Sequence, residues 1–266
     1  MPGTDTATSR EQVTASWHRI HAELPGIHHI AMPERIDRLR KRDFNKIIES
    51  DVCLPSPARI LEAGCGSGRD SLFFSTLGHS CVAIDIDETP LAKLRNAQLL
   101  YEERNPGVSL QLTAEHADIF HLPFADNSFH FVFNSGVIEH YDTATRLALL
   151  REMHRVTTAG GCACIIFPNK KHLLYGWWEM LANRFASKSA YDIPESDLTD
   201  VVQDLDSVGL ELIREDWLDC YETICHYPSV MPLRAIAHIM ATLMPRPPAS
   251  MRKLMGVRTI ILARKQ

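Results

Sequence analysis

The sequence predicts an α/β fold built on a doubly wound parallel sheet with helices on both faces. Short apolar runs alternate with longer helical stretches between residues 58 and 168. These runs are apolar throughout, which is typical of parallel strands that are covered on both sides. The loop after the first run contains Gly64, Gly66 and Gly68. A glycine loop there favours a ligand crevice at the carboxyl ends of the strands.

The expected elements follow one another in a regular order. Strands are expected at 59–62, 81–84, 109–113, 129–134 and 162–167, with helices between them at 69–77, 89–104 and 143–156. Turn residues mark the joints, because Gly78 follows the first helix and Asn105-Pro106-Gly107 follows the second. A helix at 195–208 and strands at 209–215 and 256–264 are expected to continue the sheet.

Three further segments fall outside this alternation. Residues 1–50 predict an N-terminal helical lid, with an unstructured tail at 1–10 and a second helix at 34–49, ahead of a main domain at 51–266. The segments 169–194 and 216–250 interrupt the pattern with aromatic and proline residues. We expect them to be inserts, with a helix near 232–243.

Composition restricts the classes of function. The chain has 266 residues, 45% of them hydrophobic, and a formal net charge of −5. The acidic balance does not favour a nucleic-acid partner. No apolar run approaches the roughly 18 residues that span a membrane, and the polar N-terminus does not resemble a secretory signal. The seven cysteines are scattered, so we expect reduced thiols and a cytoplasmic location. Either a monomer or a homodimer fits.

The glycine loop gives the main ligand signal. Its sequence is Glu62-Ala63-Gly64-Cys65-Gly66-Ser67-Gly68, between a strand and a helix. Glycine permits a tight turn and a close approach of a ligand to the backbone. A dinucleotide loop has the spacing G-x-G-x-x-G and binds a pyrophosphate, which the Glu62 carboxylate would repel. An NAD-dependent dehydrogenase is therefore disfavoured, and a ligand with an ammonium or sulfonium cation is favoured.

Two more acids end or follow strands on the same side of the expected sheet. Asp85 ends the second apolar run, where a carboxylate can accept both vicinal hydroxyl groups of a ribose. Asp118 lies after the third run and could accept the exocyclic amine of an adenine, with Ile119 packed on the face of the base. The competing interpretation of Asp118 is an ordinary turn residue.

With these residues in place, the chain resembles the class I S-adenosylmethionine-dependent methyltransferases, most closely the small-molecule branch that includes the ubiquinone/menaquinone-type enzymes. The matching stretches, in order, are ILEAGCGSG, AIDIDETPLAKLRNA, AEHADIFHLPFADNSFHFVFNSGVIEHYD and LREMHRVTTAGGCACIIFPN. They cover about residues 58–168. The resemblance implies a Rossmann-like seven-stranded sheet whose last strand is antiparallel. It also implies S-adenosylmethionine as cofactor, with S-adenosylhomocysteine as its product.

The resemblance further implies a role for each matching residue. The methionine part of the cofactor would be held by Glu62 and by the backbone of Ala63, Gly64, Cys65, Gly66 and Gly68. Asp85 would hold the ribose, and Ile86, Asp118 and Ile119 would contact the adenine. Asn134 and Ser135, at the end of the fourth strand, would face the transferred methyl group.

Candidates for the chemistry itself lie after the fourth strand and in the flanking segments. His140 and His226 are the candidate general bases, because an oxygen acceptor must lose a proton. The alternative for His140 is a structural role at the start of the next helix. Residues expected to wall the acceptor pocket are His28, His29, Tyr175, Trp178 and Tyr227. Cys220, Cys225 and His226 lack a metal-ligand spacing, so no metal is expected.

The sequence therefore predicts an enzyme that transfers a methyl group from S-adenosylmethionine to an oxygen or nitrogen of a small organic acceptor, aromatic or apolar in character. A protein or RNA acceptor is an alternative, disfavoured by the acidic pI near 6.2 and by the lack of a proline turn in Asn134-Ser135-Gly136-Val137. A non-catalytic partner or regulatory protein that binds the cofactor is another. It would carry the same glycine loop, so turnover alone separates it from an enzyme.

Overall fold

The structure is a computed structural model that describes residues 9–23, 43–172, 198, 200–220 and 247–266. The predicted helix near 232–243, most of the second N-terminal helix and most of both inserts lie outside these residues. Among the described helices, none is both long and apolar enough to cross a membrane.

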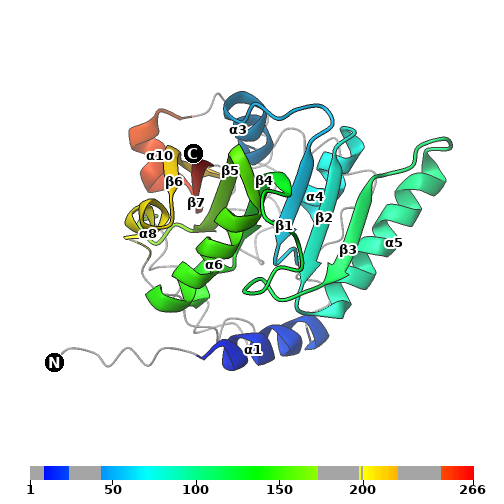
Figure 1. Ribbon diagram of the computed structural model, residues 1–266, viewed down its shortest axis with the longest axis horizontal. Helices are drawn as coiled ribbons and strands as arrows, with labels where there is room; N and C mark the ends of the chain where they lie inside the picture. Colours follow the sequence, from blue (N-terminus) through cyan, green and yellow to red (C-terminus); the bar gives the residue numbers. More distant parts are fainter. Residues whose placement is uncertain (1–8, 24–42, 173–197, 199, 221–246) are drawn as a thin grey trace, which may run out of the picture.

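A seven-stranded sheet forms the centre of the molecule, in the order β3-β2-β1-β4-β5-β7-β6 (Figure 1). The strands are β1 (Arg59–Ala63), β2 (Ser80–Asp85), β3 (Leu112–His116), β4 (Phe129–Ser135), β5 (Thr157–Pro168), β6 (Leu210–Leu218) and β7 (Arg258–Lys265). β1 to β5 pair in parallel, and β7 is antiparallel to both β5 and β6. This confirms the predicted doubly wound sheet with its antiparallel last strand. The order reverses between β1 and β4, which is where such sheets bind ligands.

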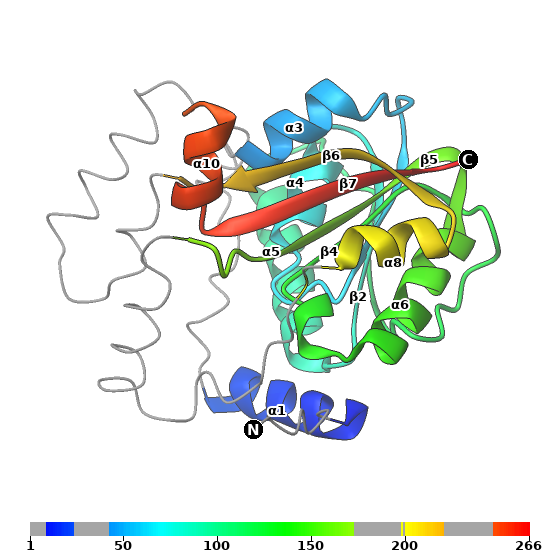
Figure 2. The same cartoon turned by 90° about the vertical axis from the view of Figure 1, so that its left-hand side faces the viewer.

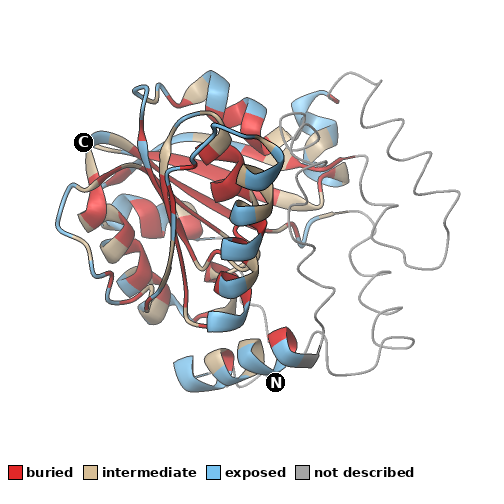
Figure 3. Cartoon of the chain, turned by 90° about the vertical axis from the view of Figure 1, so that its right-hand side faces the viewer, coloured by how far each residue is buried: buried red, intermediate tan, exposed pale blue. Residues whose placement is uncertain are grey.

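Helices cover both faces of the sheet (Figures 1 and 2). One face is packed by α3 (Asp43–Asp51), α4 (Arg69–Thr76) and α5 (Glu88–Arg104), and the other by α6 (Thr143–Val156) and α8 (Val201–Ser207). The helix α1 (Arg10–Glu23) lies across one edge of the sheet (Figure 1). Two short helical elements complete the description: η2 (Ile138–His140) follows β4, and α10 (Ala249–Met255) precedes β7. The central strands are buried, the edge strands β3 and β6 are partly exposed, and the helices are exposed on their outer sides (Figure 3).

The hydrophobic core follows the alternation of side chains along each strand. Ile60 of β1 packs toward α3 and α4, and its neighbour Leu61 packs toward α6. Phe44 of α3 lies 5.5 Å from the ring of Phe133 on β4, and Phe74 of α4 lies 6.0 Å from the same ring. α3 is therefore part of the main core, and the predicted domain boundary at residue 50 falls inside this helix.

The structure corrects several local expectations, and one of them is the start of β5, which is Thr157 rather than residue 162. β3 begins at Leu112 rather than at residue 109, because it is an edge strand with a weak burial pattern and its bounds follow from pairing with β2. α10 begins at Ala249, within the last two residues of the expected insert at 216–250, and continues through residues for which no element was predicted. Arg10 was expected in an unstructured tail, but it begins α1. Its position depends on contacts with distant residues, which local periodicity does not encode.

Candidate active site

A cavity of about 250 Å³ lies at the carboxyl ends of β1, β2 and β4, beneath α1. Most residues that were predicted to hold the cofactor line it together: Glu62, Gly64, Cys65, Gly66, Asp85, Ile86, Asp118, Ile119 and Ser135. They come from separate loops, and the parallel strands bring those loops to one edge of the sheet. Figure 1 shows α1 crossing this edge.

Glu62 is the buried acid of this cavity, with 5% of its surface exposed. The backbone N–H and the hydroxyl of Ser71 donate to its Oε2, at 3.0 and 2.6 Å. Burial raises the pKa of Glu62 to about 8, and the neighbouring Asp70 carboxylate contributes to the rise. No described residue hydrogen-bonds Oε1. A cationic group placed there would pair with the carboxylate and bring its pKa down.

The glycine loop has the backbone conformation that its sequence suggests. Gly64, Gly66 and Gly68 all have positive φ, at 75°, 49° and 58°, which L side chains rarely adopt. Gly68 does not line the cavity. It precedes α4, and a Cβ there would lie 2.2 Å from Leu94 of α5. Gly68 is therefore required for close packing of the loop against α5, while Gly64 and Gly66 form the cavity wall.

Asp85 connects the second strand to the glycine loop. Its Oδ2 accepts the backbone N–H of Gly66 at 2.8 Å, and its Oδ1 accepts the backbone N–H of Asp87 at 3.0 Å. Burial raises the pKa of Asp85, and these backbone hydrogen bonds oppose the rise. The carboxylate therefore fixes the shape of the loop and also presents an acceptor to the cavity.

Four cavity residues come from α1, which lies within the predicted N-terminal lid: Arg10, Thr14, Trp17 and His21. None of the four was predicted individually as a site residue. The Arg10 guanidinium donates to Asp118 Oδ2 at 2.5 Å and stacks 3.9 Å above the ring centre of Phe120. At the other end of α1, the Nδ1 atoms of His18 and His21 lie 3.1 and 2.9 Å from Asp87 Oδ2. These contacts fasten α1 over the cavity at both ends.

Further cavity residues adjoin the predicted motifs. Arg69 and Asp70 begin α4 directly after the glycine loop, and Tyr141 follows η2. Burial raises the pKa of Tyr141 to about 12, so this phenol stays protonated at neutral pH. The sequence signal for Tyr141 was its place directly after Glu139-His140, because this run follows a strand that ends at the cavity.

Other predicted residues do not line the cavity. Ala63 is buried next to Glu62 on the opposite face of β1. Asn134 is buried beneath α6, with its Nδ2 3.2 Å from Met153 Sδ. His140 packs against Trp17 with ring centres 5.6 Å apart and is absent from the lining. The remaining candidates lie outside the described residues: His28, His29, Tyr175, Trp178, His226 and Tyr227.

Comparisons with known proteins agree with this geometry. Residues 61–165 match the family model described as a methyltransferase domain. A probable S-adenosylmethionine-dependent methyltransferase of Mycobacterium tuberculosis is 32% identical over 111 residues, which are 42% of this chain and 36% of that protein. The malonyl-[acyl-carrier protein] O-methyltransferase of Erwinia pyrifoliae is 36% identical over 103 residues, covering 39% of this chain and 34% of that one. The match thus spans about a third of these relatives.

The central part of the chain is therefore similar to S-adenosylmethionine-dependent methyltransferases in sequence. Solved structures share its fold. The geranyl diphosphate C-methyltransferase of Streptomyces coelicolor has a TM-score of 0.58 at 11% identity, covering 88% of this chain and 80% of that one. The magnesium protoporphyrin IX methyltransferase of Synechocystis has a TM-score of 0.55 at 17% identity, covering 88% and 83%.

The residues of the cavity suit S-adenosylmethionine, which is named for the similar methyltransferases. A buried carboxyl group with a raised pKa, Glu62, is matched by the ammonium of a methionine moiety. The positive-φ glycines allow the backbone to approach a ligand closely. Asp85 places a hydrogen-bond acceptor where the ribose is expected. The described residues contain no cluster of three or more His, Cys, Asp or Glu side chains that could hold a metal ion.

Proposed function

We propose that this protein transfers a methyl group from S-adenosylmethionine to an oxygen or nitrogen of a small organic metabolite, aromatic or apolar in character. The observation that carries the proposal is the cavity itself, in which Glu62, Asp85 and Asp118 meet from three separate loops. When bound, the cofactor would supply a methyl group on a sulfonium, and the neutral thioether of S-adenosylhomocysteine would be the leaving group of an in-line displacement. The chain then has to bind and orient the cofactor and the acceptor, and to exclude water from them.

Each part of the cavity has a proposed task. Glu62 holds the ammonium of the cofactor, and the Gly64 and Gly66 backbone lies against its methionine part. Asp85 accepts the ribose hydroxyl groups, with Ile86 beside the adenine, and Asp118 and Ile119 contact the base. Ser135 faces the reacting end. The N-terminal segment, residues 1–50, acts as a lid, which is supported by the contribution of α1 to the lining.

A base is needed if the acceptor is a hydroxyl group, because its proton must leave during the transfer. His140 is one candidate, and it would have to move away from Trp17 to reach a substrate, since the two rings are in contact. His226 is the other candidate. An amine acceptor that arrives neutral needs neither histidine.

The names of relatives support a small acceptor. Malonyl-[acyl-carrier protein], geranyl diphosphate and magnesium protoporphyrin IX appear in the names of similar methyltransferases, and the first of these carries its acid on a protein. The order of the four sequence motifs supports the ubiquinone/menaquinone-type branch. Buried thiols such as Cys65 and Cys164 suit a reducing cytoplasm. We propose a monomer or homodimer.

The first test is calorimetric titration of the full chain with S-adenosylmethionine, S-adenosylhomocysteine and NAD in parallel. The proposal requires binding of the first two that is lost in Glu62→Ala and Asp85→Ala. NAD binding alone would overturn it. A screen of small acceptors, scored by S-adenosylhomocysteine formed, then separates an enzyme from a non-catalytic binding protein. Turnover on protein or RNA, with none on small molecules, would favour the macromolecular alternative.

A further inference from the structure

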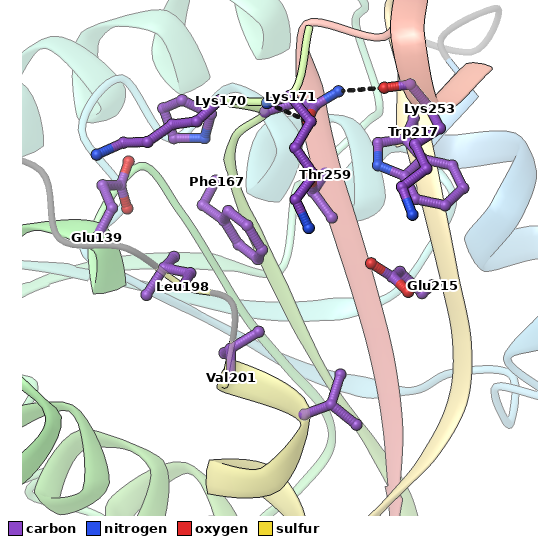
Figure 4. A pocket seen from close by; sticks show the side chains of 13 residues that line it. Glu139, Phe167, Lys170, Lys171, Leu198, Val201, Glu215, Trp217, Lys253 and Thr259 are labelled. Atoms are coloured by element: carbon purple, nitrogen blue, oxygen red, sulfur yellow. Dashed lines mark hydrogen bonds between the residues drawn. The ribbon is translucent and has the colours of Figure 1, made fainter. Parts of the chain in front are cut away.

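A second hollow, of about 80 Å³, lies where β5 and β6 end and β7 begins (Figure 4). Its floor is a cross-strand row of Phe167, Thr259 and Trp217, because Thr259 pairs with Phe167 on one side and with Trp217 on the other. Leu198 and Val201 add an apolar wall beside α8. The hollow therefore has an apolar base on the face of the sheet that α6 and α8 cover.

Three lysines line this hollow: Lys170, Lys171 and Lys253. The side chains of Lys171 and Lys253 both extend into it, from opposite sides of Thr259 (Figure 4). Lys253 Nζ lies 5.5 Å from the ring centre of Trp217. Neither ammonium forms an ion pair within the described part of the chain. Glu139 and Glu215 also line the hollow, so three ammonium groups accompany two carboxylates and the net charge of the lining is positive.

One buried side chain holds the two lysine-bearing segments together. Asn169 is 3% exposed, and its Nδ2 donates to the backbone carbonyls of Lys253 and Gly256 at 2.9 and 2.8 Å. Its Oδ1 accepts the backbone N–H of Lys171 at 3.1 Å. Both ends of this amide are therefore used to join residues that are far apart in the sequence. The lysine backbones are preorganised, which reduces the entropy lost when a ligand binds.

The hollow lies next to the cofactor cavity. Glu139 lines the hollow, and Val137 and Tyr141, on either side of it in the chain, line the cavity. The backbone N–H of Gly136 donates to Ile166 at 2.9 Å, which places the ends of β4 and β5 side by side. Neighbouring strands are about 5 Å apart. A molecule with one end in the hollow could therefore reach the methyl group over β4.

We infer that this hollow binds an anionic group of the methyl acceptor, a carboxylate or a phosphate, through Lys171 and Lys253. The volume is about a third of that of the cofactor cavity, which suits a head group rather than a whole metabolite. The apolar floor suits the aromatic or apolar body proposed above. That the bound anion belongs to the methyl acceptor rests on the proposed function. The anion site itself rests on the two lysines and their fixed backbones.

Ligand-observed NMR titration of the full chain tests the site with three probes of similar shape: benzoate, phenyl phosphate and uncharged benzamide. Benzoate or phenyl phosphate should bind at least tenfold more tightly than benzamide, and their ratio distinguishes carboxylate from phosphate. Lys171→Met and Lys253→Met should each weaken binding of the anion about tenfold, since a charged hydrogen bond is lost while the hydrocarbon stem is kept. Glu215→Gln should strengthen binding of the anion about threefold, because it removes a negative charge from the hollow.

Lys46→Met, on the exposed side of α3, is the matched control, because it removes the same charge far from the hollow. Equal binding of benzamide and the anions, no binding of either anion at millimolar concentration, or an equal effect of Lys46→Met would overturn the inference. Binding of S-adenosylhomocysteine is measured in the same variants and should not change. If anions bind through the lysines but no acceptor is ever methylated, the proposed function fails and the anion site stands.

Discussion

The raised pKa of Glu62 makes a prediction about pH that involves both cofactor binding and stability. The carboxyl group is buried, and its pKa of about 8 means that some nine in ten copies are protonated at pH 7 in the cofactor-free chain. An ammonium can pair only with the ionised form. Cofactor binding should therefore release close to one proton at pH 7 and become weaker as the pH falls below 8.

The magnitude follows from the two titrating groups. The ammonium of an amino acid has a pKa of about 7.7–8.0, so affinity should pass through a maximum near pH 8. Between pH 8 and pH 6, the ionised fraction of Glu62 falls about fiftyfold and the protonated fraction of the ammonium rises about twofold, so binding should weaken about twentyfold. The stability of the cofactor-free chain should change in the opposite direction. The folded pKa lies above the ordinary value of 4.5, so the Glu62 contribution is complete below pH 4.5 and is lost as the pH rises toward 8, at about 1 kcal/mol per pH unit.

Calorimetry with S-adenosylhomocysteine in two buffers of different ionisation enthalpy measures both the affinity and the protons released. Urea denaturation from pH 5 to pH 8 measures the stability. Glu62→Gln is the matched control, because it keeps the shape and removes the titration: its affinity should be weak and nearly flat below pH 7, and its stability should lose the slope. A wild-type affinity that does not change between pH 8 and pH 6, with no proton release, would refute the reasoning.

Three further predictions concern the frame around the cavity. Gly68→Ala should lower the free energy of unfolding by about 3 kcal/mol in urea denaturation, because strain at positive φ is added to the overlap with α5. Gly78→Ala, at φ 89° with open space around it, should lower it by only about 1 kcal/mol. Equal losses in the two variants would contradict the packing argument. Asp204→Ala should cost about 3–5 kcal/mol, because it leaves Arg146 buried without its 2.7 Å partner, and the double variant Arg146→Met/Asp204→Leu should recover most of this loss. Asp87→Asn should speed amide exchange in α1 and leave α5 protected, since asparagine still caps α5 but holds the α1 histidines less strongly; uniform exchange in both helices would contradict this.

Local sequence patterns predicted the regular part of the fold well. The helix at 143–156 has the predicted bounds, and β1, β2 and α4 differ from prediction by one or two residues at their ends. These elements have strong apolar periodicity and clear turn residues, so their local preference agrees with their tertiary packing. β3 moved because an edge strand takes its bounds from its partner, and the pairing of β2 with β3 is not written in either segment alone.

The candidate site divides in the same way. Glu62, Asp85 and Asp118 could be predicted, because each follows or ends a strand and parallel strands end at one edge. Asn134 illustrates the limit, since alternation along β4 turns its side chain beneath α6. The contribution of Arg10 could not be predicted, because it depends on α1 reaching Asp118 more than a hundred positions along the chain.

From the sequence alone we could predict a glycine loop followed by acids at the ends of successive strands, and these residues favour a crevice for a cationic ligand with a ribose. Tertiary structure decided which of those groups are buried, which α1 residues close the cavity, and that Lys171 and Lys253 share one hollow through Asn169. Periodicity and turn chemistry act over a few residues, whereas burial and the resulting pKa of Glu62 depend on every element packed around it.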